Sequence, residues 1–81
     1  MTNAFILTLS CPDRLGLVHA VSGFLLDNGG NIEEAAQFND HATGLFFMRV
    51  RFAGGADCAS LREGLAAFAA PYEMQWQLHP A

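Results

Sequence analysis

The chain of 81 residues contains no lysine, and its Lys+Arg total of 4 consists entirely of arginine. Eight acidic residues bring the formal net charge to −4. An acidic chain without lysine lacks the positive surface that dominates binding to nucleic acids and to anionic membranes, so neither is an expected partner. The missing lysine also excludes Schiff-base chemistry and lysine clamps for phosphate.

Cysteine and histidine are equally scarce. Cys11 and Cys58 form no CxxC pair, so we expect two free, reduced thiols in a cytoplasmic protein. His19, His41 and His79 lack the spacing of a metal site, and no converging catalytic set is apparent, so we expect no metal, no cofactor and no catalytic residue. The chain shows no N-terminal signal and no apolar run long enough to span a bilayer.

The residues that are present favour one small folded domain covering residues 1–81. The composition is 52% hydrophobic and only 15% charged, which is enough to build a core. This apolar share is high for so small a domain, because much of its surface must face water. We therefore expect part of the exterior to be covered by another chain or domain.

Hydrophobic periodicity predicts six elements in the order βαββαβ. This order predicts an α+β fold, the ferredoxin-like plait, with a four-stranded antiparallel sheet and two helices on one face. Asp57 is the expected N-cap of the second helix, and Pro71 the residue that ends it. The expected elements are strands over 4–10, 31–39, 45–52 and 72–78, and helices over 15–28 and 57–70.

The second expected strand is the most polar and hence the best candidate for a sheet edge. Strict alternation places Ile32, Glu34, Ala36 and Phe38 on one of its faces. The uncovered face of the sheet should carry apolar side chains that meet a partner. Those expected there are Ile6, Ala35, Leu45 and Phe47.

The segment Cys11–Leu17 joins the first strand to the first helix. Pro12 should end the strand, and Asp13 is a good N-cap for the helix, with Gly16 inside its first turn. Glycine there indicates close approach of another backbone or of a ligand. If Gly16 were merely part of a turn, Gly16→Ala would stabilise the helix. The positive end of the helix dipole is a natural seat for a carboxylate. A helix N-terminus can also lower the pKa of a nearby thiol such as Cys11, but a structural role is the one expected for this residue.

The run Asp13-Arg14-Leu15-Gly16-Leu17, followed by an apolar helix and Asp27-Asn28-Gly29-Gly30-Asn31-Ile32, resembles the signature of ACT domains, which are small regulatory ligand-binding modules. The resemblance implies that a ligand binds between the first loop of one chain and the second strand of another. The implied ligand site consists of Asp13, Arg14, Leu15, Gly16 and Leu17 with Asn31 and Ile32 of a neighbouring chain. A homodimer or higher homo-oligomer follows from this arrangement, with glycine or methionine as the candidate ligands.

A finer resemblance, over nearly the whole chain, is to the N-terminal ACT domain of bacterial formyltetrahydrofolate deformylases. These enzymes hydrolyse 10-formyltetrahydrofolate to formate and tetrahydrofolate for purine biosynthesis, and their catalytic residues belong to a following C-terminal domain. This chain alone is therefore expected to be non-catalytic. The segments that carry the resemblance are Ser10–Val18, Val21–Leu25, Gly29–Ile32, Gln37–Asp40 and Thr43–Val50.

Other functions remain open. The chain could be a free-standing ACT-type regulator of a separate partner, or a small anion-handling enzyme centred on Arg14. The aromatic strand around Phe46 and Phe47 superficially resembles an RNA-recognition motif, but the acidic balance opposes that function. A metal chaperone of this fold would need a CxxC in the first loop, where the chain has only Cys11.

Overall fold

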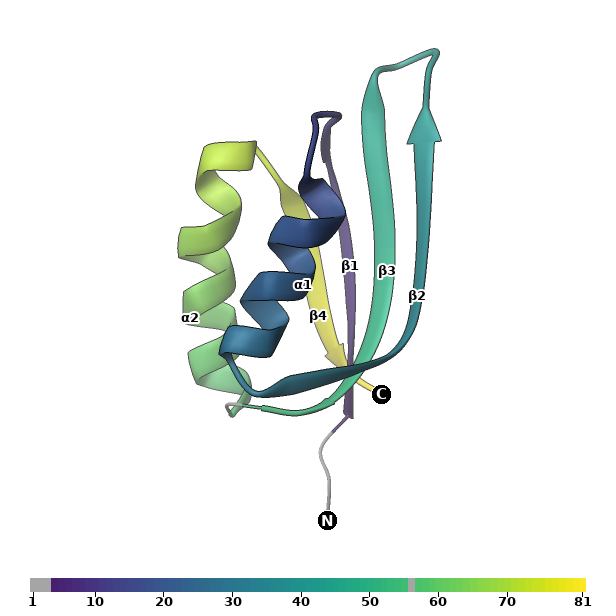
Figure 1. Cartoon of the computed structure of the whole chain (residues 1–81). Helices are drawn as coiled ribbons and strands as arrows, with labels where there is room; N and C mark the ends of the chain where they lie inside the picture. The colour runs from purple at the N-terminus through teal and green to yellow at the C-terminus, as the bar shows by residue number, and fades with distance from the viewer. Residues whose placement is uncertain (1–3, 56) are drawn as a thin grey trace.

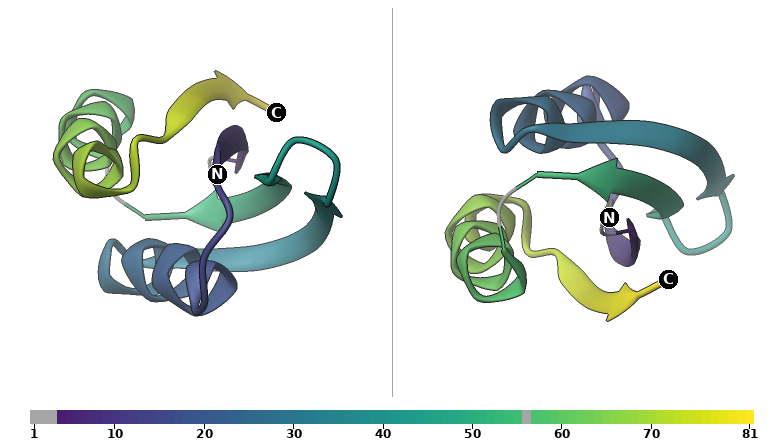
Figure 2. Two further views of the ribbon diagram at one scale, coloured as in Figure 1. Left: turned by 90° about the horizontal axis from the view of Figure 1, so that it is seen from above. Right: turned by 90° about the horizontal axis from the view of Figure 1, so that it is seen from below.

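The computed structural model describes residues 4–55 and 57–81 and shows a four-stranded antiparallel sheet with two helices on one face (Figures 1 and 2). The strand order is β2-β3-β1-β4, which is the predicted ferredoxin-like plait, with the polar strand β2 at an edge. A short 3₁₀ helix, η1, precedes the last strand. The elements are β1 (Ala4–Pro12), α1 (Leu17–Asp27), β2 (Gly30–Asp40), β3 (Leu45–Gly54), α2 (Cys58–Ala69), η1 (Ala70–Tyr72) and β4 (Gln75–Pro80).

The core lies between the sheet and the helices. Its sheet layer arises from the alternation of side chains along the central strands. The two central strands bury every second side chain, and each helix contributes one apolar stripe. On β1 and β3 the buried residues are Phe5, Leu7, Leu9, Cys11, Phe46, Met48, Val50 and Phe52; on the helices they are Leu17, Val21, Leu25, Leu61, Leu65 and Ala69.

The ends of the helices follow their capping residues. Asp57 caps α2 as predicted, because its carboxylate accepts a hydrogen bond from the Ser60 N–H at 2.9 Å. Gly29 takes a left-handed conformation after α1, with φ 79°, and its N–H donates to the Leu26 carbonyl. Tyr72 was expected in the last strand, but η1 contains it, and left-handed Glu73 turns the chain before β4.

A β-bulge changes the faces of β2. Ile32 pairs with Phe52, whereas Glu34 pairs with Arg51, so Glu33 is an extra residue without a partner. The predicted shared face of Ile32, Glu34, Ala36 and Phe38 is therefore wrong. Ile32 lies on the helix side and the other three lie on the open side, because one extra residue reverses the alternation.

The open face consequently differs from the prediction at Ala35, which lies in register with buried Val50 and hence on the helix side. Ala36 and Phe38 take its place. Phe38 packs beside Phe47 on the neighbouring strand, with ring centroids 6.2 Å apart, and their side chains are 61% and 39% exposed. The aromatic content of the open face is thus concentrated near the β2–β3 hairpin.

Candidate functional site

The loop between β1 and α1 is fixed to the β2–β3 hairpin by two hydrogen bonds. The Asp13 N–H donates to the Gly44 carbonyl at 2.9 Å, which extends the contact of β1 with β3. The Asp13 carboxylate accepts from the Asn39 side-chain amide at 3.0 Å. The loop therefore has a defined position against the end of the sheet.

The prediction that Asp13 caps α1 is wrong. The N-cap is Gly16, and no side chain in residues 4–55 and 57–81 caps the first turn of the helix. Gly16 adopts a left-handed backbone with φ 84°, so the chain turns once more before the helix begins at Leu17. This turn leaves Asp13 three residues upstream of the N-cap, where it bonds Asn39 instead.

Within the chain, the structure gives a different reason for glycine at position 16. A Cβ built on Gly16 would meet no atom within 4 Å, so close approach within the chain does not require glycine. The positive φ of this residue does require glycine, because a residue with a side chain is strained in that conformation. Because the N-cap is a glycine, it offers no side chain to the backbone N–H groups at the start of the helix.

A hollow of about 420 Å³ opens beside this helix start. It brings together all five loop residues predicted for the ligand site, and Leu15 stands fully exposed at its rim. Leu17 also lines the hollow, although its side chain is buried. The lining residues are Asp13, Arg14, Leu15, Gly16, Leu17, Val18, His19, Gln37, Asn39 and Phe46.

Asn31 and Ile32, the other two predicted site residues, do not line this hollow. They lie at the start of β2, whereas the β1–α1 loop lies near its end (Figure 1). The structure therefore does not bring the two predicted halves of the site together within one chain.

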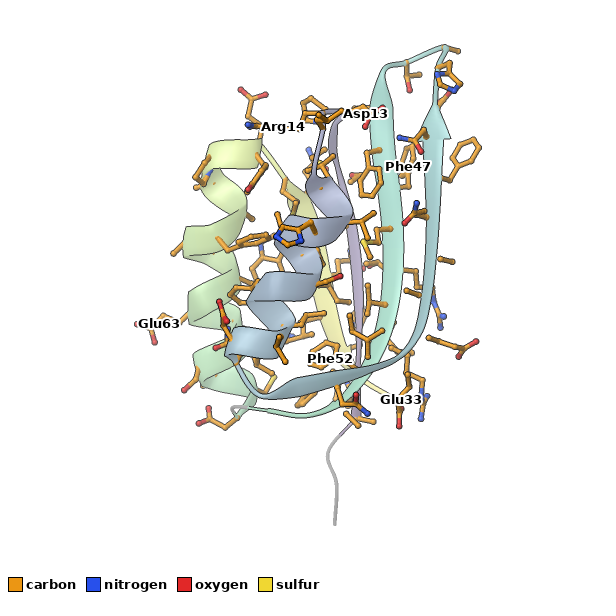
Figure 3. The ribbon with its side chains drawn as sticks, in the orientation of Figure 1. Asp13, Arg14, Glu33, Phe47, Phe52 and Glu63 are labelled. Carbon is orange, nitrogen blue, oxygen red and sulfur yellow. The ribbon has the colours of Figure 1, made fainter. Side chains whose placement is uncertain are left out.

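Three side chains at or near the hollow were not predicted. Gln37 and Asn39 reach it because the bulge at Glu33 turns them to the helix side of β2, and no local sequence signal marks that bulge. Tyr72 lies next to the loop, with the Arg14 Cζ 5.0 Å from its ring centroid. Figure 3 shows Asp13 and Arg14 at the same end of the molecule as the C-terminal end of α2.

Cys11 is a buried thiol directly before the loop. Burial raises the pKa of the Cys11 thiol, the nearby Asp13 carboxylate adds to this increase, and Arg14 opposes it. The direction is opposite to the lowering that a helix N-terminus can give a thiol pKa, and it agrees with the structural role expected for Cys11. Both cysteines are free, as expected. Across residues 4–55 and 57–81, no three histidine, cysteine or acidic side chains lie close enough to hold a metal ion.

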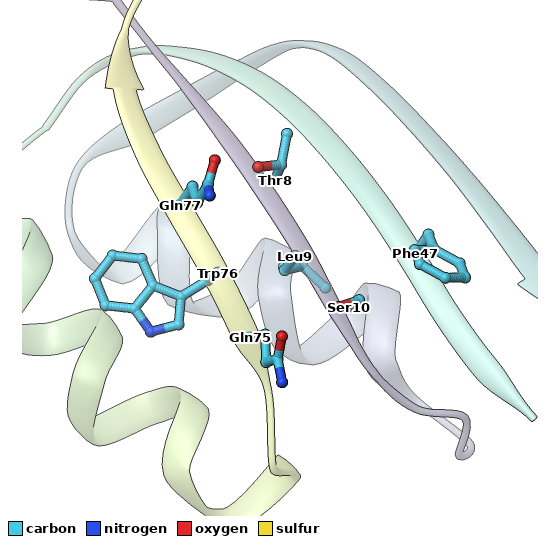
Figure 4. A pocket seen from close by; sticks show the side chains of 7 residues that line it. All are labelled: Thr8, Leu9, Ser10, Phe47, Gln75, Trp76 and Gln77. Atoms are coloured by element: carbon cyan, nitrogen blue, oxygen red, sulfur yellow. The ribbon is translucent and has the colours of Figure 1, made fainter.

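The open face of the sheet carries two shallow hollows on either side of Phe47. One, of about 410 Å³, is shown in Figure 4 and is lined on its open side by Thr8, Ser10, Gln75 and Gln77. The other, of about 360 Å³, extends toward Phe38 and Arg49. Neither contains an acidic residue or a histidine, so neither has a general base.

No helix in the described part of the chain is both long and apolar enough to cross a membrane.

Comparison with known proteins supports both the fold and the family that the loop sequence resembles. Residues 5–57 match the family model of the ACT domain. The chain is 42% identical over 76 residues to a formyltetrahydrofolate deformylase from Corynebacterium sp. (strain P-1). This match covers 90% of this chain but only 27% of that protein. It is 41% identical over 80 residues to a formyltetrahydrofolate deformylase from Bacillus subtilis, covering 89% of this chain and 25% of that protein.

Solved structures of a formyltetrahydrofolate deformylase and of an ACT domain protein share the fold of this chain. A formyltetrahydrofolate deformylase from Burkholderia mallei superposes with a TM-score of 0.88 at 34% identity, over 96% of this chain and 28% of that one. An ACT domain protein from Streptococcus pneumoniae gives a TM-score of 0.85 at 25% identity, over 98% of this chain and 90% of that one. The chain thus spans about a quarter of the length of the deformylases it matches. From its sequence match and its fold, the chain belongs to the ACT domain family.

Proposed function

We propose that this chain is a regulatory module that binds a small amino acid between two copies of itself. By its similarity to part of the deformylases, we assign it the role of their N-terminal domain. In such a protein, a C-terminal catalytic domain would hydrolyse 10-formyltetrahydrofolate to formate and tetrahydrofolate for purine biosynthesis. The two free thiols of this chain fit a reducing, cytoplasmic setting.

The observation that carries this proposal is the uncapped start of α1 at the hollow. The backbone N–H groups of its first turn receive no side-chain cap, and they form the positive end of the helix dipole. An amino-acid carboxylate is complementary to such a helix start. The hollow is also large enough for glycine or methionine, and its wall offers the Gln37 and Asn39 amides for hydrogen bonding.

One loop supplies too little binding energy by itself. A millimolar ligand needs about 4 kcal/mol, whereas a helix dipole contributes roughly 0.3–1 kcal/mol. Further contacts from a second chain are therefore part of the proposal. Asn31 and Ile32 of that chain are the proposed donors of these contacts.

The surface beside β2 is suited to a second copy. On α1, Phe24 stacks on Phe68 and so marks the side of the helix that faces α2. Val18 and Leu26 lie on the opposite flank, at helical spacing, and are 37% and 73% exposed. This apolar flank adjoins β2, whose residues are largely exposed and whose outer edge pairs with no other strand of the described residues.

Antiparallel apposition of two β2 edges would complete the site. A two-fold axis near the middle of β2, at about Ala35, places the start of the partner's strand beside the end of the first. The partner's Asn31 then lies next to Asn39, which already contacts the loop through Asp13. The two-chain geometry thus accounts for the separation of Asn31 and Ile32 from the loop within one chain.

Mixing two defective variants tests the shared site. Arg14→Ala removes a loop contact and Asn31→Ala removes a strand contact, and each variant alone should bind labelled glycine or methionine weakly in equilibrium dialysis. In an equimolar mixture, mixed dimers regain one intact site, so about a quarter of wild-type binding should return. A mixture that binds no better than the two variants separately would contradict a site made by two chains.

The alternative, a free-standing regulator of a separate partner, also has support. The ACT domain protein from Streptococcus pneumoniae is close to this chain in size, since the match covers 90% of it. The coding sequence around this chain in its gene distinguishes the two roles. A reading frame that continues into a formyltransferase-like domain supports the attached role, and one that does not supports the free-standing role.

A further inference from the structure

Arg14 is the terminal member of a row of stacked side chains that crosses the helical layer. Phe24 of α1 stacks on Phe68 of α2 with centroids 4.8 Å apart, and Phe68 packs on Tyr72 of η1 at 5.3 Å. The guanidinium of Arg14 then lies over the Tyr72 ring at 5.0 Å. The row therefore connects the β1–α1 loop to both helices.

The Arg14 guanidinium has no acidic partner in the described parts of the chain. The one ion pair found across residues 4–55 and 57–81 joins Arg51 to Glu33, at 3.2 Å. Arg14 also lines the hollow at the start of α1. A guanidinium that stacks by its face on an aromatic ring keeps the N–H groups at its edge free for a carboxylate.

We propose that Tyr72 is a positioning residue for the ligand site. Its ring holds the face of Arg14 so that the edge of the guanidinium meets the carboxylate of an amino acid bound at the first turn of α1. The inference rests on the proposed function and adds a residue outside the loop to the site. An unstacked arginine would have to lose more rotamer freedom on binding, so the stacked ring raises the affinity for a carboxylate.

Two variants and two ligands test this role. Tyr72→Phe keeps the ring, and the Tyr72 hydroxyl makes no hydrogen bond to a residue that the structure describes, so glycine affinity should be unchanged. Tyr72→Leu removes the ring and should weaken glycine binding about fivefold, as expected for an exposed cation–π contact. Glycinamide has no carboxylate, so its affinity, compared in the same titrations, should not respond to either variant. An equal loss for glycine and glycinamide would show that Tyr72 merely supports the fold and would overturn the proposal.

The contact itself has a separate spectroscopic signature. Ring currents from Tyr72 should shift the side-chain protons of Arg14 upfield in NMR spectra of the ligand-free protein, and Tyr72→Leu but not Tyr72→Phe should abolish the shift. Absence of this shift in the wild type would overturn the positioning role even if glycine binds. If the shift is present but neither glycine nor methionine binds, the proposed function fails and the inference about the ligand fails with it, while the contact stands.

Discussion

The carboxylate of Asp13 accepts a hydrogen bond from the side-chain amide of Asn39, with the two atoms 3.0 Å apart. The bond joins the β1–α1 loop to the edge strand β2, and the left-handed turn at Gly16 places the start of α1 beyond the reach of this carboxylate. Asp13 therefore belongs to the wall of the hollow, while the N–H groups at the start of α1 receive no side-chain cap.

Removing the Asp13 carboxylate should cost little stability. The bond to Asn39 is exposed, so Asp13→Ala should lower the free energy of unfolding by less than about 1 kcal/mol. Asp57→Ala is the matched control, because Asp57 is the N-cap of α2 and bonds the Ser60 N–H. Urea unfolding of both variants should show the larger loss for Asp57→Ala. Equal losses would mean that Asp13 acts as a cap.

Alanine at position 16 should destabilise the protein rather than stabilise it. Gly16 has φ 84°, where a Cβ is strained, and Gly16→Ala should cost about 1 kcal/mol. Gly23 lies inside α1 with open space around it and no positive φ, so Gly23→Ala should instead stabilise by up to about 1 kcal/mol. Thermal melts of the pair measure the difference. A stabilised Gly16→Ala protein would contradict the left-handed conformation.

The larger substitution Gly16→Leu addresses binding. It places a side chain at the mouth of the hollow and should abolish ligand binding or dimerisation while circular dichroism shows a retained fold. A Gly16→Leu protein that still dimerises and still binds glycine or methionine would show that this loop is only a structural turn.

The two cysteines should differ in their rate of alkylation. The pKa of Cys11 is raised by burial and by Asp13, so its reactive thiolate forms only at higher pH than that of an ordinary thiol. Cys58 is only partly buried. Iodoacetamide labelling followed by mass spectrometry should modify Cys58 first, with the Cys11 rate rising later along the pH series. Faster labelling of Cys11 near neutral pH would contradict its burial.

The isolated chain should not release formate from 10-formyltetrahydrofolate. Hydrolysis of a formamide needs an activated water, a stabiliser for the oxyanion and an acid for the leaving amine. The hollow at α1 contains Asp13 bonded to Asn39, Arg14 stacked on Tyr72 and one histidine, His19. A formate assay of the purified chain checks this. Turnover that disappears in Arg14→Ala or Asp13→Ala would favour the enzyme interpretation.

The fold was accessible from sequence because the central strands alternate strictly. Alternation along residues 45–52 places Phe46, Met48, Val50 and Phe52 on one face of β3, and all four are buried. The faces of β2 were not accessible, because the extra residue Glu33 is defined only by the pairing of β2 with β3. A bulge in a polar edge strand leaves no periodic signal, since few of its side chains are buried.

The site was predictable only where it is continuous in sequence. Asp13 to Leu17 form one run, which the ACT signature marks, and the structure places the whole run at the hollow. Asn39 and Tyr72 join this loop through tertiary contacts that no local pattern encodes. The capping role of Asp13 was misjudged for a related reason: the left-handed turn at Gly16 moves the helix start beyond its reach.

Sedimentation velocity with and without ligand tests the central claim most directly. If an amino acid binds between two chains, it must strengthen their association, because a ligand that binds only the dimer shifts the equilibrium toward it. Glycine or methionine should therefore move a dilute sample from monomer toward dimer, and Asn31→Ala should abolish that shift. A chain that remains monomeric while binding either amino acid tightly would contradict the account.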